Sequence, residues 1–194
     1  WSEVFPSREA CREAREHYEN LRLNDAAQCI FQFLWDEFCS WYIELSKDRL
    51  KDDAPLASKL TAKYVLLDVM QAGMRLLHPI MPFISEEIWQ EIKTRFPMQD
   101  EALIIAKFPI SDPEMIDSGI NDEMKLMQES ITAIRNLRKQ LNLSPATPIG
   151  IVARTADDTQ NTMFEDYARY FTRLAKVDSI TSGNNVDKPK PAVS

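Results

Sequence analysis

Apolar residues recur at steps of three and four over two long stretches in the first half of the sequence, and this spacing predicts amphipathic helices. The first stretch follows Asn24, a residue type that caps helix N-termini, and ends near Lys47. The second follows Pro55 and ends before Pro79. The positions expected to face a core are Ala27, Ile30, Phe31, Leu34, Phe38, Trp41, Tyr42 and Leu45 in the first helix, and Leu56, Leu60, Tyr64, Leu67, Met70, Met74 and Leu77 in the second.

Two further helices are predicted beside these. Arg and Glu alternate at helical spacing over residues 8–20, which is typical of a solvated helix. Another helix is expected from Pro82 to Arg95, with Ile84, Ile88, Trp89 and Ile92 on its inner side. Long helices with short joints form antiparallel bundles, so we assign residues 1–110 to a helical bundle. The apolar run at 103–110, flanked by proline, is expected to be extended and to lie across that bundle.

The pattern changes in the last third of the chain. A helix is predicted over 122–141, with Met124, Met127, Ile131, Ile134 and Leu141 as its apolar side, a spacing that skips Arg138. A strand at 149–154, a helix around 163–171 and a strand at 177–181 follow, an order that predicts a right-handed crossover in a small sheet. Residues 111–182 are therefore assigned to a linker helix plus a small α/β subdomain, and 183–194 to a disordered tail or severed linker. The predicted fold class is mainly α.

Composition narrows the function classes. With 44% hydrophobic and 27% charged residues the chain is expected to be globular, and it holds only four glycines and neither a GxGxxG nor a GxxxxGK[ST] run. Three cysteines and two histidines without a CxxC pair disfavour disulfides and zinc, which favours a reduced, cytoplasmic setting. No apolar run reaches membrane-spanning length, and no signal-peptide pattern precedes the helices. Because it begins with Trp1, we expect the chain to be a piece of a longer protein.

Basic residues are concentrated in one part of a chain whose formal net charge is −7. Between Ser130 and Arg154 there is no acidic residue, and Arg135, Arg138 and Lys139 fall within one turn of a single helix. Such a group can contact successive phosphates of a nucleic acid, although basic side chains are also common near helix C-termini. Composition leaves both interpretations open.

Aromatic residues form a second group. Trp35, Phe38, Trp41 and Tyr42 lie on one predicted helix that ends in Lys47, Arg49 and Lys51. Exposed rings beside cations can stack on bases, but their spacing is equally typical of a core. Phe38 is assigned to the core, whereas Trp41 and Tyr42, near the helix end, stay candidates for either role.

Three strings decide between these alternatives. FLWDEFCSWYIELSK at residues 33–47 and RLLHPIMPFISEEIWQ at residues 75–90 resemble the helical anticodon-binding domain of the valyl-tRNA synthetase family, within the class I aminoacyl-tRNA synthetases. ITAIRNLRKQLNLSPATPIGIVAR, residues 131–154, is similar to the linker helix and small α/β unit that follow in that family. The resemblance covers about Tyr18 to Ile180, and the residues before Tyr18 match poorly. Related forms of the second string occur in isoleucyl and leucyl enzymes, so those families are the first alternative.

The resemblance implies a role in tRNA binding without catalysis by this chain. In the family, ATP with Mg²⁺ is used by domains that carry HIGH and KMSKS signatures, and a separate domain edits mischarged product; neither is expected here, and no cofactor is expected in this chain. The implied partners are tRNA(Val) and the remaining domains of the same synthetase, and neither DNA nor a membrane. A helical protein-interaction module that binds no RNA is the second alternative.

The same resemblance assigns the site residues. The family's WYLE-type segment, which faces the anticodon, maps onto Trp41, Tyr42, Ile43 and Glu44, with Lys47 one turn later. Glu44 would accept a hydrogen bond from a base amino group, as carboxylates do with cytosine. The helix after the bundle would neutralise backbone phosphates through Arg135, Arg138 and Lys139.

Overall fold

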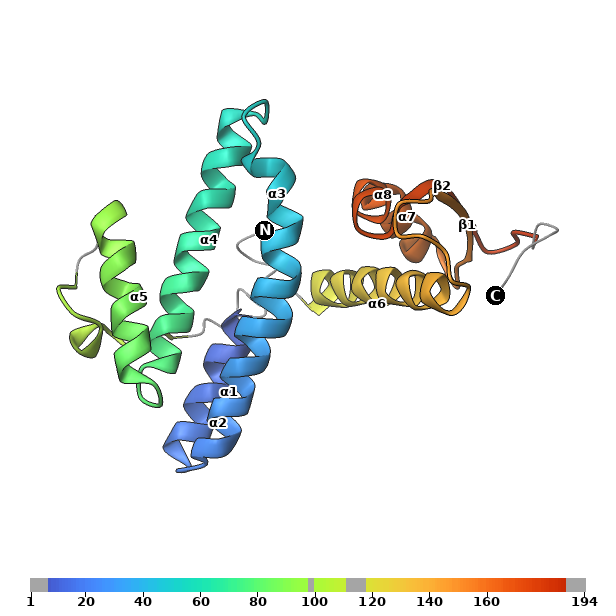
Figure 1. The fold of residues 1–194 in the computed structure, drawn as a ribbon. Helices are drawn as coiled ribbons and strands as arrows, with labels where there is room; N and C mark the ends of the chain where they lie inside the picture. The colour runs from blue at the N-terminus through green and yellow to red at the C-terminus, as the bar shows by residue number, and fades with distance from the viewer. Residues whose placement is uncertain (1–6, 98–99, 111–117, 188–194) are drawn as a thin grey trace. The chain divides into compact units, whose positions relative to one another are not determined.

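The computed structural model describes residues 7–97, 100–110 and 118–187, and the chain divides into two compact units, 1–117 and 118–194 (Figure 1). Both parts of the predicted fold class are confirmed, because the first unit is helical and the second combines helices with a two-stranded sheet. The boundary expected between residues 110 and 111 adjoins a segment outside the described residues, and most of the predicted tail, from residue 188, also lies outside them. No described helix has both the length and the apolar character needed to cross a membrane.

Helices α1 (Ser7–Glu19) and α2 (Leu23–Gln32) open the first unit as a hairpin, joined by a turn in which Leu21 has a φ of 56°. The helical path continues from α2 through the π-helical η1 (Phe33–Tyr42) into α3 (Ile43–Leu50). Helix α4 (Leu56–Leu77) returns antiparallel beside this long helix, and α5 (Pro82–Arg95) packs on α4 (Figure 1). The four predicted helices of the bundle are thus present.

The π-helical segment decides which side of the long helix is buried. Its hydrogen bonds reach back five residues, as from the backbone N–H of Ile43 to the carbonyl oxygen of Phe38. Residues five apart therefore lie on the same side of the helix, and Phe33 and Phe38 enter one core cluster together with Tyr42. The inward position predicted for Phe31 is wrong, since its ring is 63% exposed.

Helix α4 buries the predicted side only in its second half, where Met74 is buried and Met70 and Leu77 pack against the core. The expected inner residues Leu56, Leu60 and Tyr64 are exposed, and the buried positions are Ala62, Val65, Val69, Gly73, Met74 and Leu76. The close contact of Leu34 with Gly73 explains which side of α4 is buried, because a Cβ atom added at Gly73 would lie 2.5 Å from Cδ2 of Leu34. The missing side chain at Gly73 makes room for the side chain of Leu34, and the bulky apolar residues Leu56, Leu60 and Tyr64 remain outside.

The remaining elements complete the bundle on two sides. Helix α1 is solvated on one side only, since Ala10, Cys11 and Ala14 are buried. The run after residue 102 begins with a short 3₁₀ turn, η2 (Leu103–Ile105), rather than with the extended backbone expected. The N–H of Leu103 donates to Glu86 at 2.9 Å, and Phe108 packs edge-to-face on Tyr18 with ring centroids 5.9 Å apart. This run lies across the bundle as predicted.

The second unit consists of α6 (Ser118–Gln140), β1 (Ile149–Arg154), α7 (Asp158–Asp166), α8 (Ala168–Ala175) and β2 (Val177–Gly183). The two strands pair in parallel, with Ile149 opposite Val177 and a register shift directly after Ile149. Two helices replace the single one expected around 163–171, and Asp157 caps the first by accepting a hydrogen bond from the N–H of Gln160 at 2.8 Å. Buried residues of the unit include Met127, Ile131, Met163, Phe164, Phe171 and Val177.

Replacing Phe38 and Phe31 by alanine tests the π-helical register. Phe38 is 1% exposed, so Phe38→Ala is expected to lower the free energy of unfolding by about 3–5 kcal/mol. Phe31→Ala removes the same side chain from the surface and is expected to change it by less than about 0.5 kcal/mol. Urea denaturation followed by circular dichroism measures both values. Equal losses for the two variants would contradict the register.

Candidate nucleic-acid interface

Three of the residues predicted to face the anticodon are accessible where η1 runs into α3. Trp41 and Glu44 are partly exposed and Lys47 is exposed. The ammonium of Lys47 forms an ion pair with the carboxylate of Glu44 one turn earlier on the same helix. An exposed pair of this kind contributes less than about 1 kcal/mol, so it opens at little cost. The carboxylate can then accept from a base amino group while the ammonium turns to a phosphate.

The other two residues of this segment point towards the bundle. Tyr42 is 2% exposed, and its ring stacks on Phe38 with centroids 6.1 Å apart. A base cannot reach a ring in this position, so the contact role predicted for Tyr42 is corrected to a core role. Ile43 is half-buried against the same cluster, which limits its contribution to the edge of its side chain.

In the second unit, two of the three basic residues predicted on α6 are exposed. Arg135 donates from Nε to the carbonyl oxygen of Leu174 at 2.9 Å, which fixes its guanidinium beside the end of α8. Lys139 lies one turn further along α6 and is also exposed. Residues 118–194 hold ten Lys and Arg against nine Asp and Glu, whereas residues 1–117 hold thirteen against twenty-one. The excess negative charge of the chain therefore belongs to the first unit.

Arg138 has a structural role rather than the predicted phosphate contact. It is 6% exposed, and its guanidinium donates to the carbonyl oxygens of Ser144 and of Thr147, the latter at 2.6 Å. These bonds fasten the turn between α6 and β1. Arg138 follows Ile131 and Ile134 on the inner side of the helix. The apolar pattern predicted Leu141 as the next inner residue, because arginine is charged and was not expected to be buried. Leu141 is exposed.

An exposed aromatic pair on the long helix was found only in part from the sequence, because Trp35 belongs to the aromatic group considered for base stacking whereas Phe31 was assigned to the core. The rings of Phe31 and Trp35 are stacked, with centroids 6.2 Å apart and planes 9° from parallel, and Trp35 is 60% exposed. The signal that could have found them is the five-residue step from Phe33 to Phe38. That step fits a π-helical turn, and such a turn places Phe31 outside the core.

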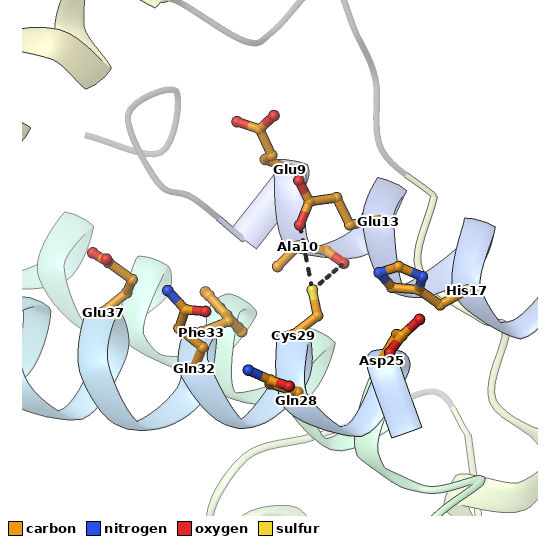
Figure 2. Close-up of a pocket in the computed structure, with 10 residues that line it drawn as sticks. All are labelled: Glu9, Ala10, Glu13, His17, Asp25, Gln28, Cys29, Gln32, Phe33 and Glu37. Atoms are coloured by element: carbon orange, nitrogen blue, oxygen red, sulfur yellow. Dashed lines mark hydrogen bonds between the residues drawn. The ribbon is translucent and has the colours of Figure 1, made fainter. Parts of the chain in front are cut away.

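An acidic groove lies between α1 and the α2–η1 helix (Figure 2). It has a volume of about 390 Å³, and Glu9, Glu13, Asp25 and Glu37 are among its lining residues. Within the described part of the chain, no three His, Cys, Asp or Glu side chains are grouped so that they could hold a metal ion. The carboxylates of the groove repel phosphate, so this side of the hairpin is unsuited to an RNA backbone.

The thiol of Cys29 faces this groove and is strongly biased towards its protonated form. Burial, followed by the charge of Glu13 and a hydrogen bond from Sγ to Glu13 Oε2 at 3.6 Å, raises the pKa of Cys29 to about 11. The carbonyl oxygen of Ala10 lies 4.0 Å from the same sulfur atom (Figure 2). A thiol held in this way is a poor nucleophile at neutral pH.

Comparison with known proteins places these features in a family. The model of the family described as "Anticodon-binding domain of tRNA ligase" matches residues 8–153. The chain belongs to the anticodon-binding domain family of tRNA ligases. This membership favours the RNA-binding interpretation of the exposed residues over the alternative of a protein-interaction module.

Curated relatives of this anticodon-binding domain carry the name valine–tRNA ligase. The protein of Fusobacterium nucleatum subsp. nucleatum is 33% identical over 183 residues, covering 93% of this chain and 20% of that protein. That of Geobacter sulfurreducens is 37% identical over 185 residues, covering 94% and 20%, and that of Acinetobacter baylyi is 35% identical over 165 residues, covering 84% and 17%. The chain spans about a fifth of the length of the curated relatives it matches.

The match corrects one expectation about the N-terminal helix. The resemblance was expected to begin near Tyr18, but the family model begins at residue 8 and so includes α1. In the structure, α1 packs against α2, and its small residues Ala10, Cys11 and Ala14 are buried. A charged sequence obscures this inner side.

Alanine variants at Arg138 and Lys139 separate the structural cation from the accessible one. Lys139→Ala is expected to leave stability unchanged and to reduce the slope of log K against log salt for tRNA binding by about 1, because one phosphate contact is lost. Arg138→Ala is expected to lower the free energy of unfolding by about 1.5–3 kcal/mol, since the carbonyl groups of Ser144 and Thr147 lose the charged donor that holds the turn, without changing that slope. Urea denaturation and a salt titration measure the two quantities. A changed slope with unchanged stability in Arg138→Ala would restore the phosphate role.

Alkylation of Cys29 tests the electrostatics of the groove. With a pKa of about 11, Cys29 is expected to react very slowly with iodoacetamide at pH 8 and progressively faster as the pH rises towards 11. Glu13→Gln removes the negative charge that opposes the thiolate, so it is expected to lower the pKa and speed alkylation several-fold at pH 8–9. Because the folded state holds the protonated thiol, the stability this group contributes is present below the ordinary cysteine pKa and is lost as the pH rises to about 11.

Peptide mass spectrometry resolves the rate at Cys29 from that at the exposed Cys39, which serves as the internal control. The Glu13→Gln substitution is expected to change the alkylation rate of Cys29 and to leave the alkylation rate of Cys39 unchanged. An unaltered Cys29 rate in Glu13→Gln would show that Glu13 does not set the pKa.

Proposed function

We propose that this chain is the anticodon-arm-binding part of a valine–tRNA ligase. In the whole ligase, valine is joined to tRNA(Val) with ATP and Mg²⁺ by parts that lie outside this chain, and the reaction takes place in the cytoplasm. The partners of the chain are then tRNA(Val) and the remaining domains of the same enzyme. Similarity to valine–tRNA ligases over most of the chain is the observation that supports this function best.

The two units contribute different contacts to this function. In the first unit, Trp41, Glu44 and Lys47 are accessible on a rigid helix, where side chains can meet base edges of the anticodon loop. In the second unit, Arg135 and Lys139 are cations on an exposed helical surface and suit backbone phosphates. Base contacts provide sequence preference, and phosphate contacts provide affinity that depends on salt.

Glu44 is the residue proposed to read a base. A carboxylate near an RNA backbone is repulsive unless it accepts hydrogen bonds, and the amino groups of bases are the donors that an RNA loop offers. The neighbouring Lys47 offsets its charge, which lowers the cost of bringing a nucleotide close. The pair therefore presents one acceptor and one cation side by side.

A titration with labelled tRNA(Val) at two salt concentrations tests the proposal. Binding to the chain is expected to weaken steeply with salt and also to weaken when the anticodon is changed. Glu44→Gln is expected to weaken binding of the unaltered tRNA by about tenfold and to reduce the penalty of the anticodon change, because a good base contact contributes about 1–3 kcal/mol of discrimination.

Glu91→Gln is the matched control, since Glu91 also forms an ion pair one turn away on an exposed helix surface, with Arg95 on α5. It is expected to have no effect on tRNA binding. Binding that is sensitive to salt but indifferent to the anticodon would remove the base-reading role and leave only the cations of α6. Absence of binding at both salt concentrations would contradict the proposed function of the chain.

A further inference from the structure

The stacked pair Phe31 and Trp35 forms a small aromatic surface that the core does not use. Both rings are more than half exposed, and neither belongs to the core clusters of the first unit that the described residues form. Their planes are 9° from parallel, so a third flat ring could continue the same stack. Large exposed aromatic rings in this arrangement are a common means of holding an unpaired base.

This aromatic pair lies on the same side of the long helix as Glu44 and Lys47. The hydroxyl of Ser40 donates to the carbonyl oxygen of Trp35 at 2.8 Å, which places Ser40 one π-helical turn beyond Trp35. Glu44 follows four residues later, and its ion pair with Lys47 continues the line by one more turn. The line from Trp35 to Lys47 is roughly 18 Å long at the rise of an α-helix, a distance that a few nucleotides of a loop can span.

The charges along this line favour bases over phosphates at its aromatic end. Asp36 is exposed directly beside Trp35, and its carboxylate repels phosphate. Further along, the ammonium of Lys47 pairs with Glu44, and that of Lys51 lies 2.7 Å from Asp48. The surface is therefore close to neutral. Affinity along it has to come from stacking and hydrogen bonds rather than from net attraction to the RNA backbone.

The surroundings of the pair distinguish it from a protein-docking surface. The exposed neighbours one turn before and after the two rings are Gln28, Gln32, Asp36, Cys39 and Ser40, none of which is a large apolar residue. Two rings set among such residues expose far less apolar area than the roughly 1,000 Å² that a stable protein interface buries. They match the size of one or two nucleobases instead.

We propose that Phe31 and Trp35 are a stacking platform for an unpaired base of the anticodon loop, next to the base-reading segment at Glu44. This inference rests on the proposed function, because it assumes that the chain binds the anticodon arm. It extends that function to two residues upstream of the segment matched to the anticodon and gives them a sequence-tolerant role, since every base has a flat face.

Substitutions at Trp35 test the platform with a labelled RNA hairpin that carries the anticodon arm of tRNA(Val). Trp35→Leu keeps an apolar side chain but removes the aromatic face, and it is expected to weaken binding roughly 5- to 100-fold. Trp35→Phe keeps a ring and is expected to lose less than about threefold. The salt dependence of binding is expected to be the same in both variants, because no phosphate contact is removed.

Tyr64→Leu is the matched control, since Tyr64 is an aromatic residue that is 67% exposed on α4, a different helix from the one that carries Phe31 and Trp35. It is expected to bind the hairpin like the unaltered chain. Urea denaturation of each variant checks that the bundle is intact, which the exposure of all the substituted residues favours.

A second set of hairpins, each with one loop base removed, identifies the stacked nucleotide. One abasic position is expected to weaken binding of the unaltered chain but to leave binding of Trp35→Leu unchanged, the non-additivity expected of two groups in contact. Equal binding by Trp35→Leu and the unaltered chain would overturn the platform and leave the proposed function standing. A hairpin that does not bind the unaltered chain, together with tRNA(Val) that does not bind either, would overturn both.

Discussion

The five-residue hydrogen-bond step within η1 is the constraint on which the first unit depends. An α-helix over the same residues would turn Phe33 and Phe38 to different sides, whereas the π-helical segment brings both into one cluster with Tyr42. The same step turns Phe31 and Trp35 outwards and leaves Glu44 and Lys47 on an accessible side of α3. Core and candidate binding surface therefore arise from a single choice of helical register. The core stabilises that register, because restoring an α-helix would expose aromatic rings that are now buried.

The existence and type of nearly every helix and strand could be predicted from the sequence, but the buried sides could be predicted only in part: Ile30, Leu45 and Trp89 are buried as expected, whereas Phe31 and Leu60 are exposed. Periodicity identifies an apolar stretch reliably when one side is clearly polar. Helix α4 has two apolar sides, and its inner side is chosen by Gly73, which lets Leu34 approach at a distance that no Cβ would allow. Pairwise fit of this kind depends on a partner that lies far away in the sequence. The π-helical step was missed for a related reason, since the spacing of three and four assumes α-helical geometry throughout.

Burial of charge explains the errors at the candidate site. Arg138 was placed outside because arginine is charged, yet its long aliphatic part packs inwards and its guanidinium meets the carbonyl oxygens of a turn. No pattern of apolar residues indicates such a position, because the partners are backbone atoms of Ser144 and Thr147 rather than side chains. Tyr42 is the opposite error, a residue predicted to be accessible that is buried. Its place in a string similar to a tRNA-binding segment suggested contact with RNA, but adjacent residues on a helix face different directions, so only some of that segment can be exposed.

The acidic character of the first unit suits selective contact with an RNA loop. A surface rich in lysine and arginine binds any RNA through its phosphates, with affinity that carries no sequence information. Residues 1–117 instead hold a large excess of acidic residues, so an RNA that makes only backbone contacts is repelled by this unit. Under the proposed function, short-range contacts of Trp41, Glu44 and the aromatic pair with bases have to overcome that repulsion. An RNA loop whose bases do not fit these groups is still repelled by the acidic residues but makes no compensating contacts. The repulsion therefore increases the difference in binding free energy between matched and unmatched loops. In the same proposal the cations of α6 contribute affinity to both kinds of RNA equally, so discrimination is expected to arise in the first unit.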